Sequence, residues 1–451
     1  MIERVAIVGS GFSGTLQALN LLRHDGPRAV LIERADEPGR GLAFGAADPS
    51  HVLNVRASNM SAFPDAPDHF LQWLEARGMP GVARSFVPRL VYGDYLREML
   101  LAVLAAAPDR LTIVKGEVVD LVAGDRLWLR LSGGKRLEAD AVVLAVGNLP
   151  PHDPPGLDAA ALPERAYQRD PWSRYPGGDL DERDDLLLIG TGLTMVDVAT
   201  LLDARGFRGR IVALSRRGLL PQAHAATSPP AQQLRDRPRA GVSRLLRQVR
   251  ERAREVGDWR AAVDELRPFT QAMWAGATEA ERARFLRHLR PWWDVHRHRL
   301  APEVANRLAA MRADGRLTIL AGKTLAFAEC ADGVDVTWRP RGTGRAERLH
   351  VRRIVNCTGP LGDLSHTREP LLRALVDRGA IRPDAARLGI DVDRDAAVID
   401  ADGRADPRLF AVGPMTRGAF WEIVAVPDIR TQTWSLARRL AGAHQVGGEG
   451  L

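Results

Sequence analysis

Two glycine-rich turns, each between an apolar strand and a helical pattern, constrain the fold of this chain most strongly. The first lies in VAIVGSGFSG, Val5–Gly14, and the second in LLLIGTGLTMVD, Leu186–Asp197. In the first, Gly9 permits a tight bend, Gly11 lets a pyrophosphate approach the backbone, and Gly14 lets the helix pack against the strand. The free N–H groups of such a helix then bind phosphate. The sequence therefore predicts a dinucleotide unit at each turn.

The strand after each turn indicates which nucleotide would bind. The strand AVLIER carries Glu33 near its end, where an acid accepts hydrogen bonds from adenosine ribose hydroxyls. We include the adjacent Arg34 in this predicted site. The first turn therefore suits a nucleotide with a free ribose, which we predict to be FAD, because two dinucleotide sites in one chain suggest a hydride relay from NADPH to a flavin.

The second turn departs from the first in one position. Gly190 and Gly192 match, but Met195 replaces the third glycine, and Thr194 precedes it. The next strand, RIVALSRRG, ends without an acid. It carries instead a hydroxyl and two guanidinium groups, which bind a 2′-phosphate. The second site is therefore predicted to hold NADPH through Gly190, Gly192, Thr194, Ser215, Arg216 and Arg217, although an exposed strand end would also explain the arginines.

The net charge of +7 is concentrated in one region of the 451 residues. Residues 221–316 hold 19 Arg, no Lys and 11 acidic residues, whereas the rest of the chain is close to neutral. A basic region can bind nucleic acid, attract an anionic small molecule, or form a solvated helical surface. With small-molecule sites already indicated, we expect a small-molecule substrate that could be anionic, and no nucleic-acid partner.

Several classes of protein do not fit the sequence. Only two cysteines occur, Cys330 and Cys357, which excludes a disulfide scaffold and a Cys-x-x-Cys redox pair. We find no signal peptide, no membrane span, no metal-ligand cluster and no Ser-His-Asp arrangement. We therefore expect a cytoplasmic protein without a metal site, and the oligomeric state stays open.

Further motifs give the chain a resemblance to a known family. It resembles the YdhS-like FAD/NAD(P)-binding proteins and, more distantly, two-dinucleotide flavin monooxygenases, including N-hydroxylating ones. The resemblance extends over nearly the whole chain and is carried by VGSGFSG, GRGLAFG (39–45), HVLNVRASNMS (51–61), FVPRLVYGDYL (86–96), GTGLTMVD, LSRRGLLP, PWWDVHRHRLAP (291–302) and VGPMTRGAFWEIVAVPDIRTQ (412–432).

The resemblance implies a set of cofactor contacts. Asn54 or Asn59 would lie beside the flavin ring, and the turn at Gly413 would lie near the ribityl chain. Many such flavoproteins have Gly-Asp at this turn, whereas this chain has Gly413-Pro414. The FAD pyrophosphate and ribose would be held by Gly9, Gly11, Ser13, Gly14 and Glu33.

The expected fold class is α/β, with two Rossmann-like domains, for FAD and NADPH, and a helical Arg-rich insertion. FAD binding would use residues 1–150 and 352–451. The NADPH domain would span residues 151–351, with the insertion at about 221–316.

The predicted function is an FAD-dependent, NADPH-consuming oxidoreductase. The leading hypothesis is a monooxygenase that acts through a C4a-(hydro)peroxyflavin on a soft nitrogen or sulfur, or on a carbonyl. This chemistry comes mainly from the cofactor, which is consistent with the lack of a catalytic triad. The alternatives are an NADPH-dependent flavin reductase or dehydrogenase with an acceptor other than oxygen, and a non-catalytic dinucleotide-binding regulatory module.

Catalytic residues are not identified by a motif. In RPWWDVHRHRLAPEV, Trp292, His296 and Arg299 share one face at helical spacing. Paired tryptophans favour core packing, but four cationic or titratable residues in a row are costly to bury without partners. We predict that this helix lines the flavin cavity, and that His296, Arg297 or Arg299 faces an anionic group. Asn54 is a further candidate.

Overall fold

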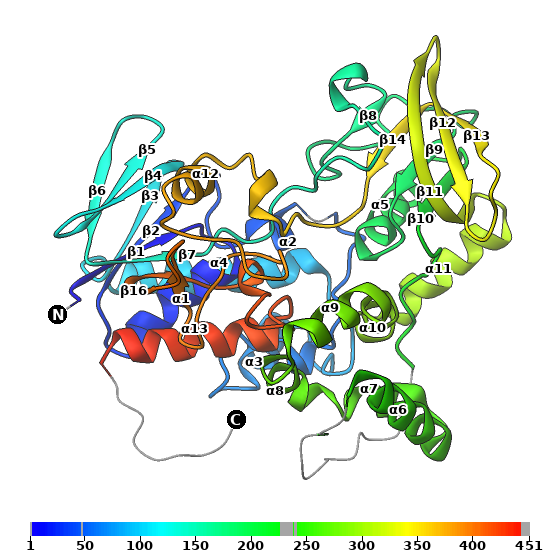
Figure 1. The fold of residues 1–451 in the computed structure, drawn as a ribbon. Coiled ribbons are helices and arrows are strands. Elements are labelled where there is room, and N and C mark those ends of the chain that lie inside the picture. The colour runs from blue at the N-terminus through cyan, green and yellow to red at the C-terminus, as the bar shows by residue number, and fades with distance from the viewer. Residues whose placement is uncertain (1, 47, 226–237, 239–240, 443–451) are drawn as a thin grey trace.

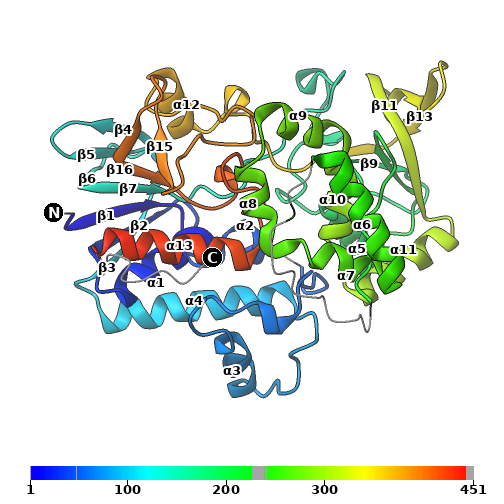
Figure 2. The same ribbon diagram turned by 60° about the horizontal axis from the view of Figure 1, so that its bottom comes forward.

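The computed structural model describes residues 2–46, 48–225, 238 and 241–442. They form two lobes, each built on a sheet with a parallel core, and a group of helices that lies along one side of the second lobe and reaches toward the first (Figures 1 and 2). The α/β class and the pair of Rossmann-like units predicted from the sequence are confirmed.

The first lobe contains a six-stranded sheet made from both ends of the chain. Strands β1 and β2 pair in parallel, and β1 also pairs in parallel with β7, so the first glycine turn leaves the sheet from a central strand. In spatial order the strands are β15 (Ala397–Ile399), β16 (Ala405–Ala411), β7 (Ala141–Leu144), β1 (Arg4–Val8), β2 (Arg28–Glu33) and β3 (Leu111–Lys115).

Different elements bury the two faces of this sheet. One face packs on α1 (Phe12–Arg23), α4 (Arg89–Ala106) and α13 (Val426–Leu440). The other packs on α12 and a small antiparallel sheet. The elements of this second layer are α12 (Pro370–Asp377), β4 (Val118–Ala123), β5 (Leu127–Leu131) and β6 (Arg136–Ala139). The lobe also contains two short helices, α2 (Gly41–Gly45) and α3 (His69–Ala76).

The second lobe contains a seven-stranded sheet. The second glycine turn follows β9, which lies between β10 and β14. Helices α5 (Leu193–Ala204) and α11 (Pro302–Ala313) cover one face. In spatial order the strands are β13 (Glu347–Val351), β12 (Gly333–Pro340), β11 (Leu317–Cys330), β10 (Ile211–Ser215), β9 (Leu186–Ile189), β14 (Arg353–Asn356) and β8 (Tyr167–Gln168).

The predicted domain boundary after residue 351 needs a correction. Strand β14 was assigned to the second FAD segment, but it pairs with β9 along its whole length, from Arg353 with Leu186 to Asn356 with Ile189. The second lobe therefore extends through residue 356. A buried strand followed by a glycine does not reveal from its sequence which of two similar sheets it joins.

The predicted insertion is mainly helical in its described residues. Between β10 and α11 it forms α6 (Val242–Val256), α7 (Trp259–Asp264), α8 (Thr270–Ala275), α9 (Glu279–His288) and α10 (Arg290–Arg297). Residues 226–237 and 239–240 of the predicted insertion lie outside the described residues. Helix α11, also predicted within it, packs on the second sheet instead, as the crossover helix between β10 and β11.

Candidate functional site

The first glycine turn has the geometry that a nucleotide-binding turn requires. Gly9 has a φ of +100°, and a Cβ there would lie 2.5 Å from the Ala145 carbonyl oxygen. A Cβ at Gly14 would lie 1.8 Å from the Gly9 carbonyl oxygen, so no side chain fits between helix and strand. At Gly11 the nearest atom would be the Gly41 Cα at 3.6 Å, an ordinary contact. Gly9 and Gly14 thus shape the turn, and Gly11 leaves its backbone accessible.

This turn opens into a cavity of about 820 Å³, which we name the first cavity. Helix α1 begins there without a side-chain cap and without an acid in its first turn, so its N–H groups suit a phosphate. Leu42 and Val424 are 53% and 36% exposed and both line the cavity, where a planar apolar ring would cover them. The other predicted residues that line it are Gly9, Gly11, Ser13, Glu33 and Arg34. The lining therefore fits FAD.

Two charged residues are held at the end of β2. Glu33 accepts hydrogen bonds from the backbone N–H groups of Ser10 at 2.7 Å and Ala35 at 2.8 Å, which fixes its carboxylate at the cavity. Arg34 pairs with Glu369 at 2.8 Å and Glu117 at 3.4 Å, and all three line the cavity. The acid predicted for the ribose therefore lies at the cavity, next to an arginine that already has carboxylate partners.

The two asparagines predicted beside the flavin lie elsewhere. Asn54 accepts a hydrogen bond on its carbonyl oxygen from His224 at 3.0 Å, and Asn59 is exposed; neither lines the first cavity. The segment reaches the cavity through His51 instead. The Nε2 of His51 lies 2.9 Å from the Asp197 carbonyl oxygen of the second lobe. No residue from 53 to 61 lines the first cavity, so the resemblance does not predict the contact of this segment with it, which depends on the fold.

The late turn of the first lobe touches the first helix. Gly413 has a φ of +84°, and a Cβ there would lie 2.3 Å from Ser13 Oγ. The next residue, Pro414, lines the first cavity. Gly413 is therefore required by close packing against the phosphate-binding helix, and its neighbour is the residue that faces the cavity.

The second glycine turn repeats this geometry with one change. Gly190 has a φ of +120°, and a Cβ there would lie 2.1 Å from the Cys357 carbonyl oxygen. A Cβ at Gly192 would meet nothing within 4 Å, and α5 begins there without a side-chain cap or an acid in its first turn. Met195 is buried in the core of the lobe. Thr194, one residue before Met195, lines the first cavity.

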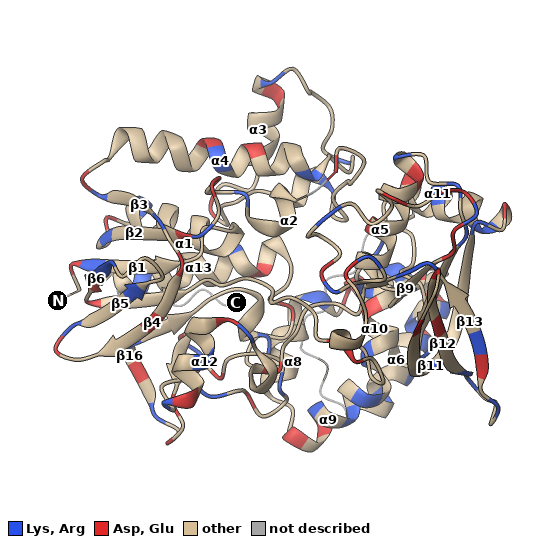
Figure 3. Cartoon of the chain, turned by 90° about the horizontal axis from the view of Figure 1, so that it is seen from above, with Lys and Arg blue, Asp and Glu red and all other residues tan. Residues whose placement is uncertain are grey.

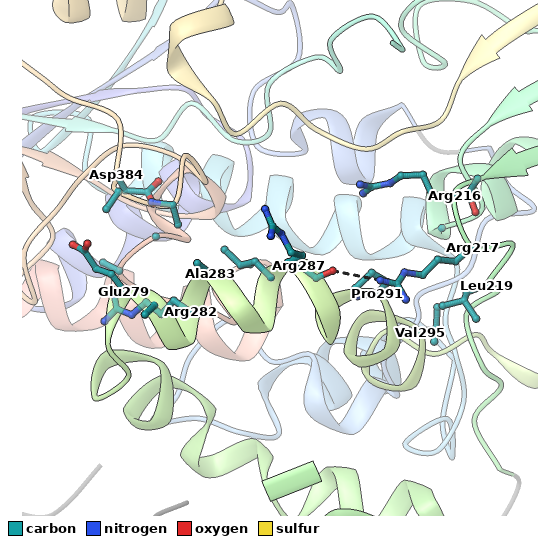
Figure 4. A pocket seen from close by; sticks show the side chains of 18 of the residues that line it. Arg216, Arg217, Leu219, Glu279, Arg282, Ala283, Arg287, Pro291, Val295 and Asp384 are labelled. Atoms are coloured by element: carbon teal, nitrogen blue, oxygen red, sulfur yellow. Dashed lines mark hydrogen bonds between the residues drawn. The ribbon is translucent and has the colours of Figure 1, made fainter. Parts of the chain in front are cut away.

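A larger cavity, of about 1360 Å³, lies beside this second turn (Figure 4). We name it the second cavity. Its walls come from the second lobe, from helices α9 and α10 of the insertion, and from residues 382–392 and 418–419 of the first lobe. Gly192, Ser215, Arg216 and Arg217 all line it. Ser215 Oγ also lies 2.8 Å from Thr191 Oγ1 and accepts a hydrogen bond from the N–H of Gly218, which fixes the strand end.

A partly buried ion pair joins the two lobes beside the first cavity. Arg89, at the start of α4, donates to both carboxylate oxygens of Asp197 in α5, at 2.7 and 2.9 Å. Arg89 lines the cavity together with Trp172, which packs edge-on against His51. For Arg89 in VPRLVYG, the resemblance left open a contact with a phosphate or the substrate and an ion pair, and the structure shows an ion pair. Its partner Asp197 and the nearby Trp172 have no predicted role, because their position depends on how the lobes meet.

The prediction that His296, Arg297 or Arg299 faces the flavin cavity is wrong. Arg299 is 5% exposed and donates to both oxygens of Asp264 at 2.9 Å. Arg297 pairs with Glu422 at 3.1 Å, and His296 Nδ1 lies 2.7 Å from the Trp292 carbonyl oxygen. None of the three lines the first or the second cavity. Arg297 and Arg299 each have a carboxylate partner from their own chain, although Nε and Nη2 of Arg297 form no hydrogen bond with the described residues.

Helix α10 instead forms part of a buried contact with the late segment of the first lobe. Trp293 Nε1 donates to the second carboxylate oxygen of Glu422 at 2.9 Å. Burial, with the nearby guanidinium groups of Arg297 and Arg417, lowers the pKa of His298 to about 3, so this imidazole stays neutral. Two other residues of the helix, Pro291 and Val295, do line the second cavity. Helix α10 therefore lines the second cavity with apolar side chains, and its Arg297 binds the helix to the first lobe through Glu422.

One cluster on the second sheet was not expected from the sequence. Cys330, Asp332 and His350 offer atoms that all lie within 4.8 Å of one another. Asp332 and His350 are exposed, and His350 also contacts Asp335 at 3.0 Å. The cluster lies on the β11–β13 strands, and it is assembled by strand pairing rather than by sequence spacing. No helix in the described part of the chain is long and apolar enough to cross a membrane.

Comparisons with known proteins agree with this geometry. Residues 6–149 match a family model described as FAD-NAD(P)-binding. An uncharacterized protein of Mycobacterium tuberculosis is 24% identical over 98% of this chain and 96% of its own length. YdhS of Escherichia coli is 24% identical over 49% of this chain and 47% of its own length. The L-aspartate N-monooxygenase (nitrosuccinate-forming) of Streptomyces cremeus is 33% identical over 25% of this chain and 19% of its own length.

Solved structures share the fold over the full chain at low identity. The FAD-bound cadaverine monooxygenase of Erwinia amylovora superposes with a TM-score of 0.68 and 15% identity, covering 100% of this chain and 97% of that one. The ornithine hydroxylase of Pseudomonas aeruginosa gives 0.66 and 14%, covering 98% and 100%. Residues 6–149 are thus an FAD/NAD(P)-binding domain, in a homologue of YdhS that has the fold of the N-hydroxylating flavin monooxygenases.

Proposed function

We propose that this protein is a cytoplasmic FAD-dependent monooxygenase that uses NADPH and hydroxylates the amine nitrogen of a small molecule. One observation carries the proposal. Thr194, in the first turn of the helix that follows the second glycine turn, lines the first cavity. A coenzyme bound at Gly192 can therefore direct its nicotinamide toward a flavin bound at Gly11, which is the arrangement that hydride transfer requires.

The residues of the first cavity would hold FAD by three kinds of contact. The α1 N–H groups at Gly11 and Ser13 would bind the pyrophosphate, and Glu33 would accept from the adenosine ribose. Leu42 and Val424, both partly exposed, would cover the ring. When bound, FAD supplies hydride acceptance and the activation of O₂. The chain's own contribution is to orient the ring and to keep water from it.

The residues of the second cavity would hold NADPH. The first turn of α5 would bind the pyrophosphate at Gly190 and Gly192, and the arginines at the end of β10 would bind the 2′-phosphate. Among the described residues, no acid lies in the first turn of α5 and none ends β10, so nothing there repels a phosphate. The coenzyme would thus span the space between Arg216 and Thr194.

The choice of an amine nitrogen is supported by the neighbours. The structural matches include enzymes named for ornithine, lysine and cadaverine, and a relative in sequence is named for aspartate. Each of these substrates is a small molecule with an amine. Arg89, which pairs with Asp197, and Trp172 line the first cavity at its contact with the second lobe, where such a substrate would lie.

The test is the coupling of NADPH oxidation to product. We expect one equivalent of N-hydroxylated product per NADPH consumed when the FAD-loaded protein meets its amine in air, with ornithine, lysine, cadaverine and aspartate as the first amines assayed. Catalase and a direct peroxide assay give the uncoupled fraction as a control. If every amine yields only H₂O₂, or if a dye is reduced at the expense of oxygenation, the protein is a reductase or an oxidase instead.

A further inference from the structure

Among the described residues, three arginines that line the second cavity have side chains without an ion pair or a hydrogen bond, Arg216, Arg287 and Arg341, and the same holds for Lys323. Two of these arginines come from elements that meet beside the second glycine turn. Arg216 extends from the end of β10, and Arg287 from α9 of the insertion, and both point into the cavity (Figure 4). Among the described residues, neither guanidinium group forms an ion pair or a hydrogen bond. A carboxylate partner is the usual way to neutralise an arginine in a cavity, so these two guanidinium groups favour an anion beside them. Glu279 and Asp384 also line the cavity, at the end away from Arg216 (Figure 4).

Arg217, the other arginine of the strand end, has a different contact. Its Nη2 donates to the carbonyl oxygen of Arg287 at 3.4 Å. This carbonyl lies in the last turn of α9, at the end of the helix that carries partial negative charge. Basic residues occupy this end and acidic ones the start, as Figure 3 also shows. The contact of Arg217 therefore fastens the end of α9 to the end of β10, close to where Arg287 enters the cavity.

Arg282, the second arginine of α9 that lines the cavity, already has hydrogen-bond partners. Arg282 donates to the carbonyl oxygens of Trp274 at 3.0 Å and Ala275 at 3.1 Å, and it lies over the Trp274 ring. It thereby connects α9 to α8. Of the cavity-lining arginines on α9, Arg287 is thus the one whose guanidinium group is available to a ligand in the described structure.

We propose that Arg216 and Arg287 grip the 2′-phosphate of NADPH from two sides, while Arg217 positions α9. This inference rests on the proposed function, and it changes the expected phosphate site from two neighbouring arginines of one strand end to one arginine from each of two elements. Two guanidinium groups that approach a phosphate from different directions can each donate in a bidentate manner. The insertion then has a defined role, since it completes the coenzyme site and makes the chain specific for NADPH.

The experiment measures dissociation constants of NADP⁺ and NAD⁺ for the FAD-loaded protein by calorimetry. We expect the parent protein to prefer NADP⁺. Arg287→Ala and Arg216→Ala should each weaken NADP⁺ by about tenfold, equal to about 1.4 kcal/mol, and leave NAD⁺ nearly unchanged. Arg287→Lys should retain part of the affinity. Arg217→Ala should weaken NADP⁺ more than NAD⁺, but less than Arg287→Ala does, because displacing α9 moves Arg287 relative to the phosphate.

The matched control is Arg284→Ala, an exposed arginine of α9 that does not line the cavity, and it should bind both coenzymes as the parent does. Unchanged NADP⁺ affinity in Arg287→Ala, with a loss in Arg216→Ala, would overturn the two-sided site and leave the proposed function standing. A parent protein that binds NADP⁺ and NAD⁺ equally would instead show that the proposed coenzyme is wrong. Binding of 2′,5′-ADP separates the phosphate contact from the nicotinamide end, and only the NADP⁺-selective variants should lose it.

Discussion

Gly11→Val is expected to abolish the retention of FAD while the protein stays folded. A Cβ at Gly11 would meet only the Gly41 Cα, at 3.6 Å, so the substitution creates no clash within the chain. The remaining side-chain atoms would extend into the first cavity where the pyrophosphate would lie. Each lost N–H contact to a charged phosphate costs about 1.5–3 kcal/mol, so two of them weaken binding by roughly a hundredfold or more.

The measurement is the flavin-to-protein ratio after purification, together with the melting temperature without added FAD. Gly133→Val is the matched control, because a Cβ there meets nothing within 4 Å and the residue lies in the β5–β6 turn, away from the cavity. It should retain FAD as the parent does. Gly14→Val is not equivalent, since its Cβ would lie 1.8 Å from a backbone oxygen and would disturb the fold itself. Full flavin content in Gly11→Val would show that the first turn does not bind the cofactor.

Arg297→Ala is expected to destabilise the protein by about 3–5 kcal/mol, the usual cost of removing one partner from a buried ion pair. Its partner Glu422 is 2% exposed, and the Arg297 side chain is 11% exposed. The carboxylate would keep the hydrogen bond from Trp293 but would lose its cation. Chemical denaturation of the FAD-loaded protein measures the change, and the exposed Arg284→Ala should lie within about 0.5 kcal/mol of the parent.

A second variant separates the pair from the helix as a whole. If the loss comes from an uncompensated carboxylate, Arg297→Met combined with Glu422→Gln should recover most of the stability, because the neutral amide still accepts from Trp293. Coenzyme affinity should be unchanged in the double variant, since neither residue lines the second cavity. An Arg297→Ala protein that is fully stable but has lost substrate binding would restore the ligand role that the sequence suggested.

The sequence predicted the parts of the site that depend on local backbone geometry. Gly9, Gly14 and Gly190 could be assigned because a tight turn between strand and helix leaves no room for a side chain, whatever surrounds it. The acid at Glu33 and the arginines after β10 followed from their spacing to those turns. Each of these contacts lies within one supersecondary unit, so the residue order alone places it.

The predictions that proved wrong concern contacts between segments that are far apart in the sequence. Arg297 pairs with Glu422 and Arg299 with Asp264. These partners are 125 and 35 residues away in the chain, so the sequence around the arginines does not reveal them. Likewise, the contribution of Arg287 to the second cavity depends on how α9 packs between the lobes, which no periodicity reveals. Similarly, His51 lines the first cavity and Asn54 does not, because the path of this irregular segment determines which of its side chains face the cavity.

The central claim is that the two cavities hold FAD and NADPH in contact with each other, and anaerobic mixing tests it most directly. The FAD-loaded protein is mixed with NADPH in a stopped-flow instrument without oxygen, and the visible absorbance of the flavin is followed. We expect the absorbance to bleach in a single turnover, and to bleach more slowly with NADH at the same concentration. Flavin that stays oxidised in the presence of saturating NADPH would contradict the account, because the coenzyme would then not reach the first cavity.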